Sequence, residues 1–403
     1  MSTSRKILFL IYATLLSVIG LFASEMYVPA LGTIQSYFHS DAAKVGLSIS
    51  IYMTGFAVAQ LFYGALSDQI GRKPPLLVGL VVFLAGTLGC VFATTIEAFL
   101  AFRLVQALGV GAAYVLWQPM VFDLFQGAEV QRLFARLMAL GSLSPALAPL
   151  FGGYLTKALG WHSVFWVIVG LTVVLVLWTA VGYRESLAPG SRQPFSASRL
   201  LRQYGGFLTS RFFVGNAGAI ACGLATYFVF LTILPIVLTD LGYAPDAIGS
   251  MYFPLVIAFI IGTEIGRRRH HALGDRGSCK LGAGLGLAGA GLLMVSSLVG
   301  VTSHWQLVPP AMLVTFGNGF LVPTGMAYLI KNHPDRAGAC ASAAGFLAAL
   351  MSFASTFLAS LVVDRIGVFA MTGTMLLFAL VMNVSLYWGG APVTSCRPAS
   401  SSP

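Results

Sequence analysis

The stretch GALSDQIGRKPPLL, residues 64–77, lies between two long apolar runs and carries Asp68, Gly71, Arg72 and Lys73 within six positions. So short a polar interval predicts a tight connection between two helices. Because Arg and Lys mark the cytoplasmic side of membrane proteins, the turn is predicted to lie at that face of a membrane.

Composition points to the same class of protein. Of the 403 residues, 57% are hydrophobic and only 9% are charged, and the mean hydropathy is +0.86. A soluble domain needs far more charge to cover its surface, and a membrane-spanning helix needs about 20 apolar residues. We therefore predict an all-α integral membrane protein with twelve transmembrane helices. The predicted spans are residues 7–29, 43–66, 74–94, 98–122, 133–157, 162–183, 211–236, 247–266, 279–300, 306–330, 337–362 and 367–389.

A long polar interruption, RESLAPGSRQPFSASRLLRQYGGFLTS, follows the sixth span. Its Pro, Ser and Gly content is typical of a linker. We predict an N-terminal six-helix bundle over residues 1–183, a cytoplasmic linker over 184–210, a C-terminal six-helix bundle over 211–389 and a disordered cytoplasmic tail over 390–403.

The net charge of +10 reflects topology, because nineteen of the 23 Lys and Arg residues fall on one side of the predicted spans. This is the positive-inside pattern with both termini cytoplasmic, and it does not indicate a nucleic-acid partner. The five cysteines are scattered without CxxC spacing and the six histidines form no metal constellation. We expect no catalytic residues, no metal and no cofactor. The sequence has no phosphate loop, nucleophile elbow or HExxH motif, so it does not predict an ATP-driven pump or a hydrolase.

Glu25, within FASEMYVPAL, is an acid inside the first span. A carboxylate in a bilayer costs several kcal/mol unless it is protonated, paired or facing water. Counted from Ile7 it lies about 27 Å along the helix, in the outer half of the membrane, and Pro29 then breaks the helix. The functional interpretation is a proton or substrate site; the alternative is an interfacial residue wetted from outside.

Arg103 lies near the outer end of the fourth span, at a depth comparable to that of Glu25. A charge pair or a shared cavity with Glu25 is one interpretation, and a structural tie to backbone carbonyls is the other. Small residues on the face that follows Arg103 leave room for a pocket, although aromatic residues near span ends are also common as belt residues. The candidate substrate-cavity residues are polar or aromatic side chains within spans: Tyr27, Tyr114, Trp117, Gln118, Asn216, Tyr227 and Asn318.

The fifth span contains GSLSPALAPLFGG, residues 141–153. Pro145 and Pro149 are four residues apart on one face, and each removes a backbone donor. Small residues on the same helix permit close helix contact. The helix motif consists of Gly141, Pro145, Pro149, Gly152 and Gly153. Ordinary membrane-helix packing is the alternative interpretation.

The charged turn is a candidate conformational gate. An acid at the end of one span can accept hydrogen bonds from amides at the start of a neighbouring helix, and Arg72 or Lys73 can pair with Asp123 or Glu129. The gate set is Gly64, Asp68, Gly71, Arg72, Lys73 and Asp123. A tight turn with positive-inside charges is the simpler alternative. At the other membrane face, Asp364 and Arg365 are interpreted as an interfacial pair.

Three motifs resemble those of the major facilitator superfamily. G-x-L-x-D-x-x-G-R-K at residues 64–73 is similar to its signature loop between helices two and three, and R-x-x-Q-A-x-G-x-G at 103–111 is similar to its fourth-helix signature. A-P-x-x-G-G at 148–153 resembles the element that marks its antiporters. The resemblance implies a fold of two six-helix bundles, a proton-coupling role for the arginine and a conformational role for the loop.

Within the superfamily the chain resembles the twelve-span drug:proton antiporters of the bicyclomycin-resistance-like (Bcr/CflA) branch. The D-M-Y-L-P-A element of that branch is matched at residues 25–30, with Glu25 in place of Asp. The stretches at 115–118, 144–150 and 242–254 also resemble a purine nucleoside transporter of the branch.

The resemblance implies a secondary active transporter, not an enzyme. It would exchange protons, taken up at Glu25 with Arg103, for a lipophilic or nucleoside-like small molecule. The proton gradient would supply the energy, and a monomer in contact with lipid in the bacterial inner membrane is expected. Two alternatives stay open: a proton-coupled or facilitative transporter of a metabolite such as a purine nucleoside, and a non-transporting membrane sensor or scaffold.

Overall fold

The computed structural model describes residues 3–125, 133, 137, 144–187, 205–333 and 337–390. Within these ranges every regular element is helical. This follows from the apolar composition, because in a bilayer each backbone polar group must find its partner inside the segment.

The first half of the chain, residues 3–187, forms nine helical elements in the described ranges. They are α1 (Thr3–Glu25), η1 (Val28–Ala30), α2 (Leu31–Tyr37), α3 (Ala42–Ile70), α4 (Lys73–Phe92), α5 (Ile96–Leu124), α7 (Ser144–Leu159), α8 (His162–Leu177) and the π-helical turn η2 (Trp178–Gly182).

The second half, residues 205–390, contains the remaining elements. They are α10 (Arg211–Asp240), α11 (Pro245–Ser250), α12 (Phe253–Val299), η4 (His304–Gln306), α13 (Val308–Lys331), α14 (Ala337–Ile366) and α15 (Val368–Gly389).

The described helices account for the twelve predicted spans. Ten of them are long and apolar enough to cross a membrane, and the one over Pro245–Val299 is 55 residues long. It holds two spans, because Gly274, at φ +67°, breaks α12 into two helices. A positive φ of this kind favours glycine, which has no Cβ. The helix α7 is the described part of the fifth span.

The first span is longer than predicted. The helix α1 ends at Glu25, the turn η1 contains Pro29, and α2 continues to Tyr37. Proline lacks a backbone N–H and cannot continue a helix without loss of a hydrogen bond. The break therefore follows Glu25 directly and contains Pro29, four residues after the acid.

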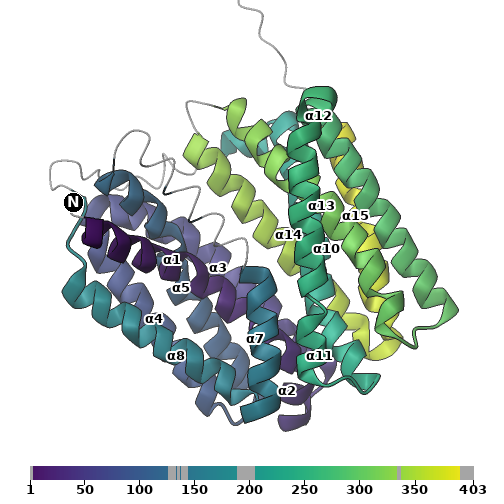
Figure 1. The fold of residues 1–403 in the computed structure, drawn as a ribbon, viewed down its shortest axis with the longest axis horizontal. Coiled ribbons are helices and arrows are strands. Elements are labelled where there is room, and N and C mark those ends of the chain that lie inside the picture. Colours follow the sequence, from purple (N-terminus) through teal and green to yellow (C-terminus); the bar gives the residue numbers. More distant parts are fainter. Residues whose placement is uncertain are drawn as a thin grey trace, which may run out of the picture.

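Figure 1 shows the first half (purple to teal) and the second half (green to yellow) as two groups of helices that meet around α2, α7 and α11. We call the end of the molecule where α3 meets α4, at Gly71 and Arg72, the basic face, and the other end the opposite face. The pairs that join the halves include α3 with α14, α7 with α11, and α2 with α10. The linker and bundle boundaries predicted at residues 183 and 210 stay predictions, because residues 188–204 lie outside the described ranges, as does most of the predicted tail.

Contacts between the halves are found toward the opposite face. Ser50 Oγ lies 2.6 Å from Thr356 Oγ1, and Lys157 Nζ on α7 lies 2.7 Å from the carboxylate of Asp246 on α11. A Cβ added to Gly32 on α2 would meet Thr239 on α10. The halves are therefore packed together at this face.

Candidate functional site

Glu25 is the last residue of α1 and is buried, with 1% of its surface exposed. In the described part of the chain, its oxygen Oε2 has no hydrogen-bond partner. The turn η1 that follows Glu25 contacts α10 and α11 of the second half, and Tyr227 and Tyr252 of that half lie within electrostatic range of the carboxylate. The acid therefore lies where the two halves meet, out of water, and it forms no ion pair among the described residues.

The two tyrosines differ in their hydrogen bonds. Tyr252 Oη donates to the carbonyl oxygen of Leu231 at 3.2 Å, whereas the buried Tyr227 hydroxyl has no partner among the described residues. Buried polar groups are nearly always hydrogen-bonded, so Glu25 and Tyr227 are two exceptions within one region. Tyr252 was not among the predicted site residues; its only sequence signal is its place in the stretch at 242–254.

Arg103 is fully buried and does not form the predicted ion pair with Glu25 in the described structure. Its Nη1 donates to the carbonyl oxygen of Ala23 at 3.1 Å and to the side-chain oxygen of Gln106. The guanidinium lies over two aromatic rings, 4.3 Å from the centroid of Tyr27 and 4.2 Å from that of Tyr52. Aromatic faces attract cations, most strongly where water is excluded, so this charge is held by two rings instead of an acid.

A second set of hydrogen bonds fixes these partners. Gln106 Nε2 donates to Thr87 at 2.9 Å, Tyr27 Oη lies 2.8 Å from Ser48 Oγ, and Tyr52 Oη donates to the carbonyl oxygen of Gly20 at 2.8 Å. Gln106 was visible in the sequence as the fourth residue of R-x-x-Q. Tyr52 and Thr87 had no such signal, because they are isolated polar groups on apolar helices.

The small residues that follow Arg103 on α5 do not open a pocket. A Cβ added to Gly111 would lie 2.4 Å from Ala59 Cβ, and one added to Gly55 would lie 2.9 Å from Ala107 Cβ. Helix α3 fills this side of α5, as small residues allow. Tyr114 lies beyond them, with its ring edge-on to Phe56 at 4.9 Å.

The other predicted cavity residues do not form one cluster with Glu25. Trp117 is buried and Gln118 half-buried on α5. Asn216 Nδ2 donates to the carbonyl of Phe212 in its own helix, and at 1.5 Å rise per residue it lies about 16 Å along α10 from Tyr227.

Asn318 ties α13 to α10 through a 2.8 Å hydrogen bond from Nδ2 to the carbonyl of Gly223. The predicted set therefore divides between residues near the charges and residues that join helices.

At the basic face, Arg72 joins three elements. Its Nε donates to Asp123 Oδ2 at 3.0 Å, and its Nη1 donates to Ser67 Oγ at 2.8 Å and to Asp68. Only 8% of the Arg72 side chain is exposed, and 16% of that of Asp123. The structure therefore brings together Asp68, Arg72 and Asp123 of the predicted gate.

Lys73 does not pair with Asp123. Its Nζ donates instead to the carbonyl oxygens of Ala180, at 2.9 Å, and Tyr183, at 2.8 Å, beside the π-helical turn. A lysine is a compact donor on a flexible stem and reaches such carbonyls readily. Glu129, the other predicted partner, lies outside the described residues.

Glu185 is the acid that the sequence analysis missed. Its carboxylate accepts the backbone amides of Arg72, at 2.8 Å, and Lys73, at 3.1 Å. Desolvation alone raises the pKa of Glu185, but hydrogen bonds from the amides of Arg72, Leu187, Lys73 and Ser186 outweigh it, so that its pKa lies below the ordinary value. The role predicted for Asp68, acceptance of amides at a helix start, belongs to Glu185. Glu185 was not singled out in the sequence because it lies in the predicted linker, where no structural role was expected.

Gly71 explains why the turn needs glycine. Its φ is +104°, and a Cβ there would lie 2.4 Å from Glu185 Oε2. By contrast, a Cβ added to Gly64 would make only an ordinary contact with Val115 at 3.6 Å. Of the two gate glycines, only Gly71 is required by its surroundings.

The fifth-span glycines lie against different neighbours. A Cβ added to Gly152 would lie 1.6 Å from the carbonyl oxygen of Met26, and one added to Gly153 would lie 2.5 Å from that of Pro245 on α11. The helix α7 is therefore in close contact with the end of the first span on one side and with the second half on the other. Pro149 is inside α7 and buried. Gly141 and the side chain of Pro145 lie outside the described structure.

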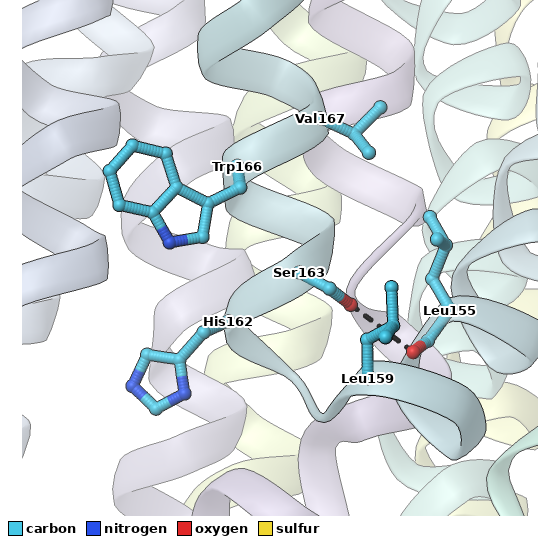
Figure 2. A pocket seen from close by; sticks show the side chains of 6 residues that line it. All are labelled: Leu155, Leu159, His162, Ser163, Trp166 and Val167. Atoms are coloured by element: carbon cyan, nitrogen blue, oxygen red, sulfur yellow. Dashed lines mark hydrogen bonds between the residues drawn. The ribbon is translucent and has the colours of Figure 1, made fainter.

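One described pocket, of about 520 Å³, lies away from these charges. Figure 2 shows that its lining comes from α7 and α8, with Ser163 Oγ donating to the carbonyl oxygen of Leu155 at 3.1 Å. Its lining residues are Leu155, Leu159, His162, Ser163, Trp166 and Val167. None of them belongs to the predicted site. Among the residues that the structure describes, no group of three or more metal-ligating side chains occurs.

Comparison with known proteins identifies the architecture. The family model of the Major Facilitator Superfamily matches residues 13–359. The chain is 28% identical over 375 residues to multidrug resistance protein D of Escherichia coli strain K12, covering 90% of each chain. It is 27% identical over 308 residues to a chloramphenicol resistance protein of Pseudomonas aeruginosa, covering 75% of this chain and 72% of that protein. A bacterial homologue of the human lysosomal transporter Spinster, solved in an inward-facing, occupied conformation, has the same fold, with a TM-score of 0.77 at 12% identity over 96% of this chain and 97% of the other.

Proposed function

Since the chain belongs to the Major Facilitator Superfamily, we propose that this transporter is a proton-coupled exporter of lipophilic small molecules that works by alternating access. It is a multi-pass membrane transporter and not an enzyme. The names of its relatives, multidrug resistance protein D and chloramphenicol resistance protein, support a drug-like substrate.

Glu25 is the observation that carries the proposal. An acid buried to 1% exposure, with Oε2 unpaired in the described structure, is costly in a membrane unless it takes a proton, a cationic partner or water. Exchange of a proton for a substrate at this carboxylate gives antiport. Tyr227 and Tyr252 supply the second half's side of the same site, so that movement of the halves changes the surroundings of the acid.

In the proposed mechanism, Arg103 stays positively charged but does not form an ion pair with Glu25. The rings of Tyr27 and Tyr52 and the oxygens of Ala23 and Gln106 hold the guanidinium. We assign it the role of raising the local positive potential, which favours release of the proton once water or substrate reaches Glu25. A direct ion pair would instead hold the acid permanently ionised.

The basic face is assigned to the cytoplasm, with both chain termini on that side, in the bacterial inner membrane. Arg72 and Lys73 lie at this face, and the positive-inside rule supports the orientation. With that assignment the structure is closed toward the outside, where the halves are packed together. Opening outward would give Glu25 a proton, and opening inward would exchange that proton for substrate.

The Arg72 contacts fit a conformational role. They join α3, α4, α5 and the segment around Glu185 within the first half, so that these elements move as one body against the second half. Substrate contact is not part of this role.

Transport in proteoliposomes tests the proposal. We expect an imposed proton gradient to drive accumulation of a lipophilic cationic dye or a neutral phenicol antibiotic against its concentration gradient. Uptake only down a substrate gradient, unaffected by the proton gradient, would contradict it and favour a facilitator.

Purine nucleosides are a second candidate substrate class for the same site. The feature that favours them is the stretch at 242–254, which contains Tyr252 and resembles a purine nucleoside transporter. A carboxylate and a tyrosine hydroxyl suit the donors and acceptors of a purine and its ribose. The same proteoliposomes loaded with a radiolabelled purine nucleoside distinguish the two classes.

A further inference from the structure

An acid of the second half caps a helix of the first half at the opposite face. The carboxylate of Asp364, near the end of α14, accepts the backbone amides of Ala42 at 3.1 Å and Ala43 at 3.2 Å. These are the first two residues of α3, whose initial N–H groups have no partner within the helix. Asp364, which the sequence analysis placed in an interfacial pair with Arg365, is therefore an N-terminal cap supplied in trans.

The helix α3 also carries an unused cap of its own. Asp41 is its N-cap residue, with φ −73° and ψ 150°, and aspartate is among the preferred residues at that position. Yet the Asp41 side chain makes no capping hydrogen bond in this conformation. Two acids are thus available to one helix start, and the one from the other half is engaged.

The trans cap is the outermost contact in a row that joins α3 to α14. Ser50 meets Thr356 at 2.6 Å, and a Cβ added to Gly46 would lie 2.4 Å from Ser360 Oγ. Ala42 and Asp364 follow at the next four-residue step on each helix. Any separation of the halves at this face must break the bonds to Asp364.

The geometry points to a switched helix cap: Asp364 caps α3 while the opposite face is closed, and Asp41 takes over in cis when the halves separate there. This inference rests on the alternating access proposed above. Because the amides of α3 find a carboxylate in both states, opening does not leave them without a partner. The exchange keeps the two conformations close in free energy, as a transporter that cycles between them requires.

The test measures how often this face opens, without reference to transport. The reporter is Ser360→Cys in a background lacking the five native cysteines, because Ser360 is fully buried between the halves. Its modification rate by a bulky thiol reagent in lipid nanodiscs follows the population of the open state when opening is fast relative to modification.

We expect Asp41→Ala to slow this modification about fivefold, because replacing an N-cap acid by alanine costs about 1 kcal/mol and only the open state uses Asp41. In the Asp364→Ala background the same change should have no effect, because Asp41 then caps α3 in both states. Asp41→Asn should behave like the unmodified reporter protein, since asparagine caps as well as aspartate; this separates capping from a folding defect.

Glu97→Ala is the matched control. Glu97 is an exposed acid near the same face that pairs with Lys44 within the first half, and its loss should leave the modification rate unchanged in either background. An equal effect of Asp41→Ala with and without Asp364, or no effect in both, would overturn the exchange. Neither outcome depends on which substrate is transported or on proton coupling, so failure of the switched cap is distinguishable from failure of the proposed function.

Discussion

Glu25 on α1 and the acids around Arg72 lie in the same half of the molecule in opposite surroundings. Arg72 has Asp68, Asp123 and Ser67 on its side chain and Glu185 on its amide. The buried Oε2 of Glu25 has no partner among the described residues. Charged groups whose hydrogen bonds and ion pairs are all formed stabilise one arrangement. A carboxylate oxygen without a hydrogen-bond partner can instead bind and release a proton or a ligand.

The largest expected effect is the loss of gradient-driven transport on substitution of Glu25, the acid whose Oε2 has no partner in the described structure. Glu25→Gln keeps the shape but removes the exchangeable proton, so gradient-driven transport in proteoliposomes should fall to background while substrate binding is retained. Glu97→Gln, at an exposed acid whose side chain is 68% accessible, should transport normally. Uphill transport by Glu25→Gln at the unmodified rate would remove Glu25 from the mechanism.

The next effect concerns stability at the basic face. Arg72→Ala leaves Asp123, with 16% of its side chain exposed, without its cation, and breaking one side of such a pair costs about 3 kcal/mol. Thermal unfolding in detergent should show a clear loss. Arg268→Ala, which removes a pair that is 73% exposed on the arginine side, should lower the unfolding temperature far less, because water screens an exposed pair. Equal losses for the two variants would show that burial of the Arg72 network has no energetic importance.

Gly71→Ala tests the conformation of the turn in the same region. At φ +104° and with Glu185 Oε2 2.4 Å from the new Cβ, alanine should destabilise the fold by about 1–3 kcal/mol. Gly170→Ala provides the control, since nothing lies within 4 Å of its Cβ position in α8. There, alanine should be neutral or stabilise by up to about 1 kcal/mol. A neutral Gly71→Ala would mean that the turn has another conformation.

The smallest effect is a pH dependence at Glu185, whose folded-state pKa is below its ordinary value of 4.5. A depressed carboxyl pKa contributes stability that is present above the ordinary pKa and is lost as the pH falls through the folded-state value. The unmodified protein should therefore unfold at a higher temperature than Glu185→Gln at pH 7, by a margin that shrinks below about pH 4. A margin that does not change with pH would assign the stabilisation to contacts other than the ionised carboxylate.

Much of the fold could be predicted from the sequence, because apolar length determines the spans and Arg and Lys distinguish the two faces. The charged turn, the buried acid and the break at Pro29 were visible for the same reason. The two helices of α12, separated at Gly274, were likewise predicted, as the spans at 247–266 and 279–300.

The partners of the charges could not be predicted as well. Depth alone suggested a charge pair of Arg103 with Glu25 as one interpretation, but the ring faces of Tyr27 and Tyr52 and a backbone carbonyl hold the guanidinium. A tyrosine in an apolar helix gives no sign of whether its face or its hydroxyl is used. Glu185 and Asp364 were missed as caps, because a cap supplied by a residue distant in sequence leaves no local spacing to detect.

Proton release on ligand binding tests most directly whether Glu25 exchanges a proton for substrate. Solubilised protein in weak buffer would receive a lipophilic cationic dye, a phenicol antibiotic and a purine nucleoside in turn, with binding followed independently. We predict that at least one class releases protons from the unmodified protein and that Glu25→Gln binds the same ligand without release. Release of equal size from Glu25→Gln, or binding without release in the unmodified protein, would contradict exchange at Glu25.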